Sequence, residues 1–262
     1  MRSLEDKVAV ITGAGRGLGA YLAKSLAGEG CHLLICDIDL EGIKKAKADI
    51  EKSSDRRVVA VSVDVTSEED VRNMVEAGVK EFSRLDLLVA NAAMSFSGSV
   101  FDIELDVWRR MLDVNLFGYF LCVREVARVM AKNNYGAIVQ INSRTGKRGS
   151  AKNSAYSASK GGGIVLTQSL SAELAEFNIR VNCVCPGPMF ESDLWQKVLF
   201  DDYAKRFNMT REQVKQKYLA EIPQKRACTY QDVANLVVFL LSDKSSHMTG
   251  QAINITGGGT VW

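Results

Sequence analysis

The sequence has few of the residues that build metal sites and no segment suited to crossing a membrane. Its 262 residues include six cysteines without a C-x-x-C pair, and only two histidines. We therefore expect no metal site, and we expect the cysteines, most of which lie in apolar runs, to be buried free thiols. No apolar run approaches the roughly 20 residues of a membrane-spanning helix. The polar residues 1–7 lead directly into an apolar run, so we expect no signal peptide and a cytoplasmic protein.

The sequence also lacks a strong charge of either sign. Thirty-three basic residues nearly balance 31 acidic ones, for a net charge of +2, which favours neither a nucleic acid nor a membrane surface as a partner. There are only three prolines, and no repeat or low-complexity tract marks a linker. With 47% hydrophobic residues, the chain is predicted to be one globular domain over residues 1–262.

Short apolar runs alternate with longer amphipathic stretches along almost the whole chain. This alternation is typical of an α/β fold, a Rossmann-type doubly wound parallel sheet with helices on both faces. Residues 189–224 break the rhythm with a long charged segment, which we interpret as an insertion that covers the substrate. Predicted strands are 8–11, 33–36, 58–63, 87–90, 137–141, 179–184 and 252–255, and predicted helices are 18–29, 40–52, 68–82, 108–131 (whole or broken), 155–177 and 229–241.

A glycine-rich turn follows the first predicted strand. Gly13, Gly17 and Gly19 fit T-G-x-x-x-G-x-G better than G-x-G-x-x-G. Glycines let backbone amides approach a pyrophosphate, and the N-terminus of the next helix points at the same anion. A glycine turn without a ligand is the alternative for this motif taken alone.

Asp37 ends the second predicted strand, about 20 residues after the glycines. Its carboxylate can accept hydrogen bonds from the adenosine ribose and would repel a 2′-phosphate, which favours NAD over NADP. Arg16 argues the other way, because a cation beside the loop can hold a 2′-phosphate. We give Asp37 more weight, since desolvating two facing anions is the costlier conflict. Asp64, at the end of the third strand, either caps a turn or meets the adenine edge.

Tyr156 and Lys160 are four residues apart in a predicted helix, so both lie on one helix face. The pKa of a phenol is ordinarily about 10, and a neighbouring ammonium lowers it, which makes tyrosine a usable general acid and base. Ser143 follows the fifth strand, at the edge of the sheet where ligands bind, and could hold the substrate oxygen. Alone, such a tyrosine–lysine pair is ordinary in helices.

The segment between Ser143 and Tyr156 is basic and has no acidic residue. Four cations there favour an anionic substrate such as a phosphorylated sugar, and a solvated basic loop is the alternative. The cations are Arg144, Lys147, Arg148 and Lys152.

Taken together, residues 12–19, residues 91–93, Asn115, Ser143 and the Tyr156-x-x-x-Lys160 pair resemble the short-chain dehydrogenase/reductase family over nearly the whole chain. The resemblance implies that Tyr156 donates and accepts the proton, that Lys160 lowers its pKa and binds the nicotinamide ribose, and that Ser143 positions the carbonyl. It implies that Asn115 kinks its helix and anchors a water. The cofactor-binding residues it implies are Gly13, Arg16, Gly17, Leu18, Gly19, Asp37, Asp64, Val65, Asn91, Ala92, Ala93, Tyr156, Lys160, Pro186, Gly187 and Met189.

The sequence departs from the family pattern at two places. Asn91-Ala92-Ala93 stands where the family more often has Asn-Ala-Gly, a change that we interpret as tolerated. The threonine often found shortly after the Pro186–Gly187 turn is missing, and Ser192 could replace it.

Several stretches resemble members of this family that interconvert sorbitol 6-phosphate and fructose 6-phosphate, which implies an NAD-linked reaction on a phosphorylated polyol held by the basic loop. Residues 186–188 instead follow the broader family, so another sugar, polyol or carbonyl substrate stays open. A non-catalytic dinucleotide-binding redox sensor is a third hypothesis, which the intact catalytic set disfavours. The stretches are 115–122, 140–143, 166–170, 230–233 and 249–251.

Three consecutive glycines, residues 161–163, lie inside the predicted helix 155–177, where each costs about 1 kcal/mol against alanine. Close helix packing could compensate. In the family this helix packs against its copy in a partner subunit, so the resemblance implies a homodimer or homotetramer.

Overall fold

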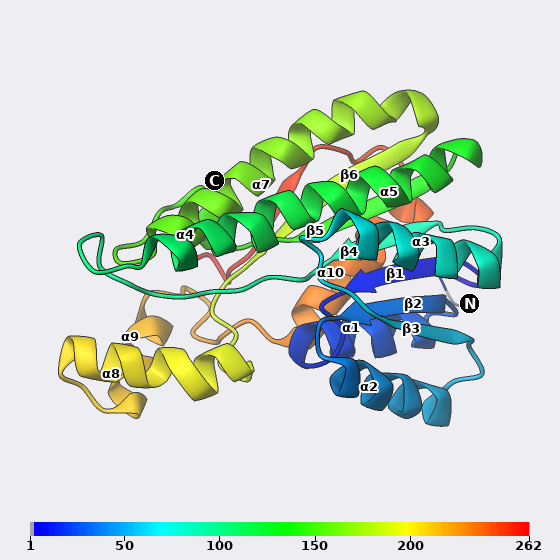
Figure 1. The fold of residues 1–262 in the computed structure, drawn as a ribbon. Helices are drawn as coiled ribbons and strands as arrows, with labels where there is room; N and C mark the ends of the chain where they lie inside the picture. Colours follow the sequence, from blue (N-terminus) through cyan, green and yellow to red (C-terminus); the bar gives the residue numbers. More distant parts are fainter. Residues whose placement is uncertain (1–2, 262) are drawn as a thin grey trace.

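The computed structural model describes residues 3–261, which form a single domain around a seven-stranded parallel sheet (Figure 1). The strand order is β3-β2-β1-β4-β5-β6-β7, so the chain winds outward first on one side of β1 and then on the other. The predicted doubly wound sheet is therefore confirmed. The strands are β1 Val8–Thr12, β2 His32–Asp37, β3 Val58–Ser62, β4 Leu87–Ala90, β5 Gly136–Ile141, β6 Ile179–Pro186 and β7 Ala252–Ile255.

Two layers of helices bury the two faces of the sheet. Successive strand residues point to opposite faces, so Ala9 and Ile11 pack with α1, α2 and α10, whereas Val8 and Val10 pack with α3, α5 and α7. Figure 1 shows these two layers above and below the strands. The layers consist of α1 Gly17–Gly28, α2 Leu40–Ser53 and α10 Tyr230–Leu241, and of α3 Glu68–Phe82, α5 Gly118–Lys132 and α7 Ser154–Glu173.

The predicted helix 108–131 is broken rather than whole. Helix α4, Leu105–Leu112, passes into a π-helical turn, η1 Asp113–Phe117, before α5 begins. Such π turns often occur at functional sites. Asn115 lies in the middle of η1 and is 1% exposed, so the interruption turns its side chain into the protein.

The predicted insertion forms a helical lobe with its own small core. It contains η3 Trp195–Leu199, α8 Phe200–Phe207 and α9 Arg211–Ala220, drawn in yellow and gold in Figure 1. A capping box, in which Thr210 and Gln213 bond each other's backbone, starts α9. The core of the lobe is built from Phe190, Trp195, Leu199, Phe200 and Val214. The remaining short helices are α6 Arg144–Lys147, η2 Leu174–Phe177 and η4 Asp243–Ser245.

The six cysteines are all free and buried, as the sequence predicts. None of the helices between residues 3 and 261 is long and apolar enough to span a bilayer. Within the same residues, no three histidine, cysteine or acidic side chains are grouped to hold a metal ion.

Candidate active site

Three side chains meet at the carboxyl ends of β5 and β6. Ser143 is the second residue after β5 and caps α6, where its Oγ accepts a hydrogen bond from Thr145 N at 3.1 Å. Tyr156, in the first turn of α7, lines the same cavity as Ser143. One turn later, Lys160 is 3% exposed, donates from Nζ to Ile141 O at 2.9 Å and lies 5.7 Å from the centre of the Tyr156 ring. The structure thus brings together the tyrosine, lysine and serine that the sequence singles out.

The titration of this pair differs from the sequence-based expectation. Burial raises the pKa of Tyr156 to about 12, and the nearby Ser143 hydroxyl opposes that rise. Burial lowers the pKa of Lys160 to about 8. We expected the ammonium to lower the pKa of the phenol. In the folded chain, loss of water around both groups outweighs their mutual effect, because desolvation disfavours phenolate and ammonium alike.

Asn115 is tied to the loop after β4 and to α7. Its Oδ1 accepts from Met94 N at 2.8 Å, and its Nδ2 donates to Met94 O at 2.9 Å and to Ser159 Oγ at 3.0 Å. A cavity of about 10 Å³, bordered by Asn115 and Lys160, lies beside it. That volume is roughly what a single water needs, and the walls offer it polar partners. Val65 and Ala92 also line this cavity.

The glycine-rich turn between β1 and α1 is shaped for close backbone approach. Gly13 and Gly17 have φ values of +66° and +56°, which favour glycine. A Cβ on Gly19 would lie 2.0 Å from Gly13 O, so no side chain fits there. No side chain caps the N-terminus of α1, where Arg16 is the N-cap residue and Leu18 lies in the first turn. The amides of that turn are therefore available to a pyrophosphate.

The carboxylate of Asp37 faces this turn, as a nucleotide-binding role requires. Its Oδ2 accepts from Gly15 N at 2.9 Å and its Oδ1 from Asp39 N at 3.0 Å. Arg16 is exposed beside it. Asp64 caps a turn, since its Oδ1 accepts from the backbone and hydroxyl of Thr66, while its Oδ2 pairs with Arg110 at 2.7 Å. The turn-capping interpretation of Asp64 is confirmed.

Asn91 joins the end of β4 to the glycine turn. Its Nδ2 donates to Thr12 O at 3.0 Å and to Gly13 O at 2.9 Å, and Thr12 Oγ1 accepts from the amides of Asn91 and Ala92. Ala93, next in the chain, is exposed. This network sets the distance between the two loops that border a nucleotide in such folds.

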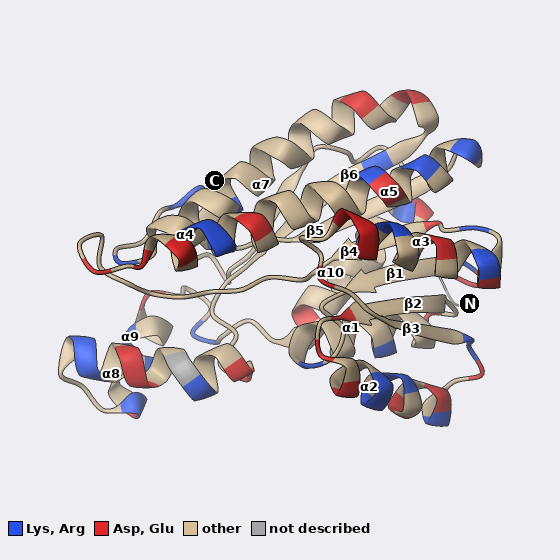
Figure 2. Ribbon diagram, viewed as in Figure 1, with Lys and Arg blue, Asp and Glu red and all other residues tan. Residues whose placement is uncertain are grey.

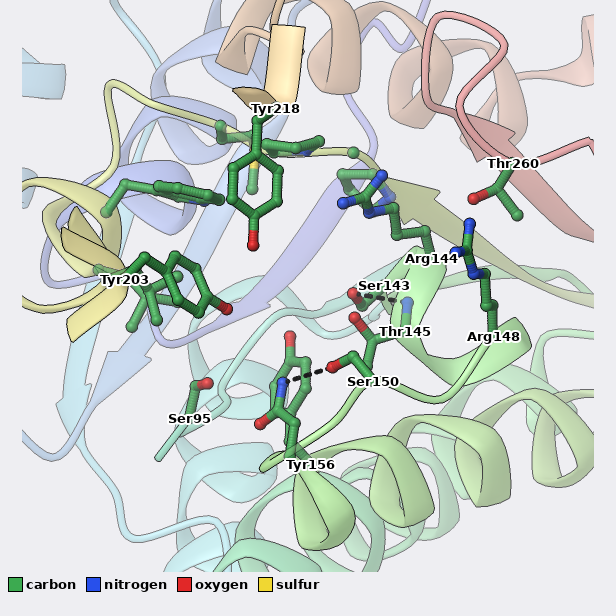
Figure 3. A pocket seen from close by; sticks show the side chains of 18 of the residues that line it. Ser95, Ser143, Arg144, Thr145, Arg148, Ser150, Tyr156, Tyr203, Tyr218 and Thr260 are labelled. Carbon is green, nitrogen blue, oxygen red and sulfur yellow. Dashed lines mark hydrogen bonds between the residues drawn. The ribbon is translucent and has the colours of Figure 1, made fainter. Parts of the chain in front are cut away.

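A cavity of about 390 Å³ opens in front of Tyr156 and Ser143 (Figure 3). Its walls come from the α6 loop, the turn after β6, the inserted lobe and the end of the chain. The residues from our sequence-based predictions that line it are Ser143, Arg144, Arg148, Tyr156, Pro186, Gly187, Met189 and Ser192.

Two of the four predicted phosphate-binding cations do not face this cavity. Lys147 turns away from it, because its Nζ donates to Ala252 O at 2.6 Å and ties α6 to β7. Lys152 is exposed and is not among the residues that line the cavity. Arg144 and Arg148 remain, and Lys217, on α9, is a third cation in the wall that the sequence did not single out.

The lobe contributes aromatic residues that the sequence analysis did not name. Trp195, Tyr203 and Tyr218 line the cavity, and Figure 3 shows the two tyrosine hydroxyls pointing into it. A signal was present, since Trp195, Leu199, Tyr203 and Phe207 recur every four residues and so form one apolar face of a helix. That spacing predicts a buried helix face but does not say that it closes over the site.

Comparisons with known proteins agree with this geometry. Residues 7–202 match the family model described as short chain dehydrogenase. Sorbitol-6-phosphate 2-dehydrogenase of Escherichia coli (strain K12) is 40% identical over 97% of this chain and 98% of its own. The crystal structure of sorbitol-6-phosphate 2-dehydrogenase SrlD from Erwinia amylovora is 39% identical, with a TM-score of 0.94 over 97% of this chain and 100% of the other.

Solved structures with either nicotinamide cofactor are also similar. NAD⁺-bound xylitol dehydrogenase is 35% identical, with a TM-score of 0.91 over 97% of this chain and 99% of the other. A variant of actinorhodin polyketide ketoreductase with NADPH is 29% identical, with a TM-score of 0.94 over the full length of both chains (100% each).

Proposed function

We propose that this chain interconverts D-sorbitol 6-phosphate and D-fructose 6-phosphate with NAD. The chain belongs to the short-chain dehydrogenase/reductase family, an oxidoreductase family that uses nicotinamide dinucleotides. One observation carries the choice of a phosphorylated substrate. Arg144 lies half-buried in the wall of the large cavity, and no carboxylate among residues 3–261 is paired with it. An unpaired guanidinium beside the reacting groups suits a phosphate, which accepts two parallel hydrogen bonds from it.

The proposed chemistry divides between the four clustered residues. A bound NAD would supply the acceptor for the hydride that leaves C2 of the polyol. Ser143 holds the C2 oxygen, and Tyr156, after releasing its own phenolic proton to the relay through Lys160, accepts the proton of the C2 hydroxyl. Lys160 holds the nicotinamide ribose and passes the proton on through a water in the small cavity beside Asn115. Because Lys160 has a pKa of about 8, it can exchange a proton near neutral pH.

The remaining predicted residues are proposed to hold the dinucleotide. Gly13, Gly17, Gly19 and the first amides of α1 take the pyrophosphate, and Asp37 accepts from the adenosine ribose. A carboxylate there favours NAD, and the relative solved with NAD⁺ supports this choice. The other proposed cofactor contacts are Arg16, Leu18, Asp64, Val65, Asn91, Ala92, Ala93, Pro186, Gly187 and Met189.

We propose that Arg144 and Arg148 contact the 6-phosphate and that the inserted lobe covers the substrate. The relatives named as sorbitol-6-phosphate dehydrogenases support this choice of substrate. A homodimer or homotetramer joined through α7 and a cytoplasmic setting complete the proposal. Six unpaired thiols suit a reducing compartment.

A substrate panel tests the proposal. Initial rates are measured with sorbitol 6-phosphate, sorbitol and xylitol, each with NAD and with NADP. We expect the highest kcat/KM for sorbitol 6-phosphate with NAD. Equal efficiency with sorbitol would reject the phosphorylated substrate in favour of another polyol. Cofactor binding without turnover of any alcohol or ketone would favour the redox sensor.

Arg144→Ala sharpens this test. We expect it to raise the KM for sorbitol 6-phosphate by roughly 10- to 100-fold, the loss of a charge-assisted hydrogen bond worth about 1.5–3 kcal/mol, and to leave the weak activity on sorbitol nearly unchanged. Lys152→Ala is the matched control, because Lys152 is a cation of the same loop outside the cavity. An equal loss with both substrates would remove Arg144 from phosphate recognition.

A further inference from the structure

Two phenols from the inserted lobe stand opposite the catalytic tyrosine in the large cavity. Tyr203 is carried by α8 and Tyr218 by α9, with ring centroids 5.5 Å apart and ring planes inclined by 32°. The Tyr203 phenol is close enough to raise the pKa of Tyr218. In Figure 3 both hydroxyls point towards the space bounded by the Tyr156 and Ser143 hydroxyls. The insertion therefore contributes polar groups to the reacting centre as well as a cover.

Both rings are fixed by their surroundings. Trp195 packs edge-on against Tyr218, with centroids 4.9 Å apart, and lies 5.7 Å from Tyr203. The guanidinium of Arg144, which also lines the cavity, lies 5.9 Å from the centre of the Tyr218 ring. A tyrosine loses little entropy when it binds, because only two side-chain torsions need fixing. The hydroxyls are thus preorganised for a ligand.

The Tyr203 hydroxyl has a proton free to donate. Figure 3 marks no hydrogen bond between this hydroxyl and the other side chains drawn around the cavity. Burial raises the pKa of Tyr218 far above its ordinary value, so this second phenol also keeps its proton. The O–H of Tyr203 can then donate to another oxygen in the cavity. Tyr203 also contributes to the raised pKa of Tyr156, as expected of two phenols that face each other.

We propose that Tyr203 is a specificity-determining residue that donates a hydrogen bond to a substrate hydroxyl beside the reacting carbon, and that Tyr218 positions it. The inference rests on the proposed function in one respect, namely that the substrate is a polyol or ketose chain. The half-buried Tyr203 hydroxyl is satisfied by a polyol and left unpaired by a substrate that covers it but lacks the hydroxyl. Sites built to bond a substrate hydroxyl reject analogues that lack it far more strongly than apolar pockets reject a change of size.

The test compares Tyr203→Phe with the unaltered enzyme on matched ketoses. Reduction by NADH is measured with fructose 6-phosphate and with its 1-deoxy and 3-deoxy analogues, each of which lacks one hydroxyl beside the carbonyl. We expect Tyr203→Phe to lower kcat/KM for fructose 6-phosphate about 10-fold. We expect the variant and the unaltered enzyme to become equal on the analogue without the recognised hydroxyl. The KM for NADH should not change.

Two further variants keep the test decisive. Tyr218→Phe should show the same dependence on the analogue with a smaller loss, because Tyr203 keeps its hydroxyl and its ring contact but loses the polar group beside it. This variant also decides the matter if Tyr203→Phe does not fold. Tyr135→Phe, outside the cavity, is the control and should match the unaltered enzyme.

An equal loss on all three ketoses would overturn the inference, since it would show a role in folding or packing alone. The comparison of Tyr203→Phe with the unaltered enzyme does not depend on whether the substrate carries a 6-phosphate. If the panel shows that the enzyme prefers an unphosphorylated ketose, the comparison is made with the deoxy analogues of that ketose. The substrate proposal then fails while Tyr203 is still tested. Turnover of simple ketones with no sugar accepted would also overturn the assignment of Tyr203.

Discussion

At the scale of single residues, Lys160 places a buried ammonium group beside Tyr156. Burial lowers its pKa from an ordinary 10.5 to about 8, and the bond to Ile141 O is the only hydrogen bond that its ammonium group makes among residues 3–261. Below pH 8 the folded protein must hold a buried charge that the unfolded chain keeps in water. As the pH rises from about 8 to 10.5, the folded state releases this proton first, so the destabilisation is progressively lost.

Lys160→Met should therefore abolish activity yet raise the free energy of unfolding at pH 7. The shift in pKa corresponds to about 3 kcal/mol, and the orphaned Ile141 carbonyl offsets about 1–2 kcal/mol of it. The gain should shrink between pH 8 and 9.5. Urea unfolding at pH 7.0 and 9.5 measures it, with exposed Lys45→Met as the control. A gain that does not change with pH would contradict the assigned burial cost.

Asp37 is the residue on which the choice of cofactor depends. Asp37→Asn keeps the shape of the side chain and an oxygen for the Gly15 amide but removes the charge that faces a 2′-phosphate. We expect the ratio of kcat/KM for NADP to that for NAD to rise roughly 10- to 100-fold, as about 1.4–2.8 kcal/mol of repulsion is lost. Asp39→Asn is a matched control, because Asp39 caps α2 and asparagine caps equally well. An unchanged ratio would assign the preference elsewhere.

For these residues, the sequence predicts where the side chains lie better than it predicts how much water surrounds them. Helical spacing alone places Tyr156 and Lys160 on one face, and the strand end before Ser143 places it beside them. The sign of the pKa change on Tyr156 could not be predicted, because it depends on how much water the fold removes. The direction of Lys147 also depends on the fold, since its partner is the Ala252 carbonyl 105 residues away.

At the scale of elements, the three glycines of α7 show what close packing requires. A Cβ on Gly163 would lie 2.6 Å from Gln140 Nε2 and 3.0 Å from Asn142 Nδ2, and one on Gly162 would lie 3.0 Å from Leu116 Cδ2. The close approach inferred from the sequence is confirmed. For Gly163 the neighbour is a strand, β5, rather than another helix. The polar residues beneath Gly163 include Asn142, whose Nδ2 donates to Lys160 O, so α7 is held at the depth that the site needs.

Gly163→Ala should destabilise the protein although alanine favours helices. Overpacking typically costs about 1–3 kcal/mol, more than the roughly 1 kcal/mol gained in helix propensity. Gly28→Ala is the matched control, because Gly28 is helical and a Cβ there would meet nothing within 4 Å. It should stabilise the protein by up to about 1 kcal/mol. Thermal melting compares the two, and equal effects of both variants would contradict the packing argument.

The inserted lobe marks the limit of prediction for elements. An insertion at the strand ends could be predicted from a break in the β-α rhythm after residue 188, although we predicted none of its helices. The residues of the lobe that face the cavity could not be predicted. Tyr203 and Tyr218 belong to different helices, and the packing of these helices around Trp195 decides where the two side chains point. Local periodicity identifies an apolar face, whereas the tertiary contact decides what that face covers.

At the scale of the whole molecule, the outer face of α7 is a part of the surface with very little charge. Charged residues are scattered over α2, α3 and α5, whereas α7 is almost free of them (Figure 2). Of its two charged residues, Lys160 is buried and Glu173 is the last residue of the helix. Val165 is 64% exposed on this helix. An uncharged helix face of this kind is typical of an interface between subunits, which supports the proposed homo-oligomer.

Val165→Arg should therefore separate the subunits. In an interface with two-fold symmetry the same residue comes from both copies, so each substitution removes about 1.5–3 kcal/mol of apolar burial and buries unpaired charges that face each other. Size-exclusion chromatography with light scattering should show an oligomer for the unaltered chain and a smaller species for the variant. Val79→Arg, on α3, should leave the mass unchanged.

Because α7 also carries Tyr156 and Lys160, we expect the separated subunits to lose activity as well. The helix that bears the catalytic pair loses its outer support. An unaltered chain that is monomeric at micromolar concentration would contradict this account of α7.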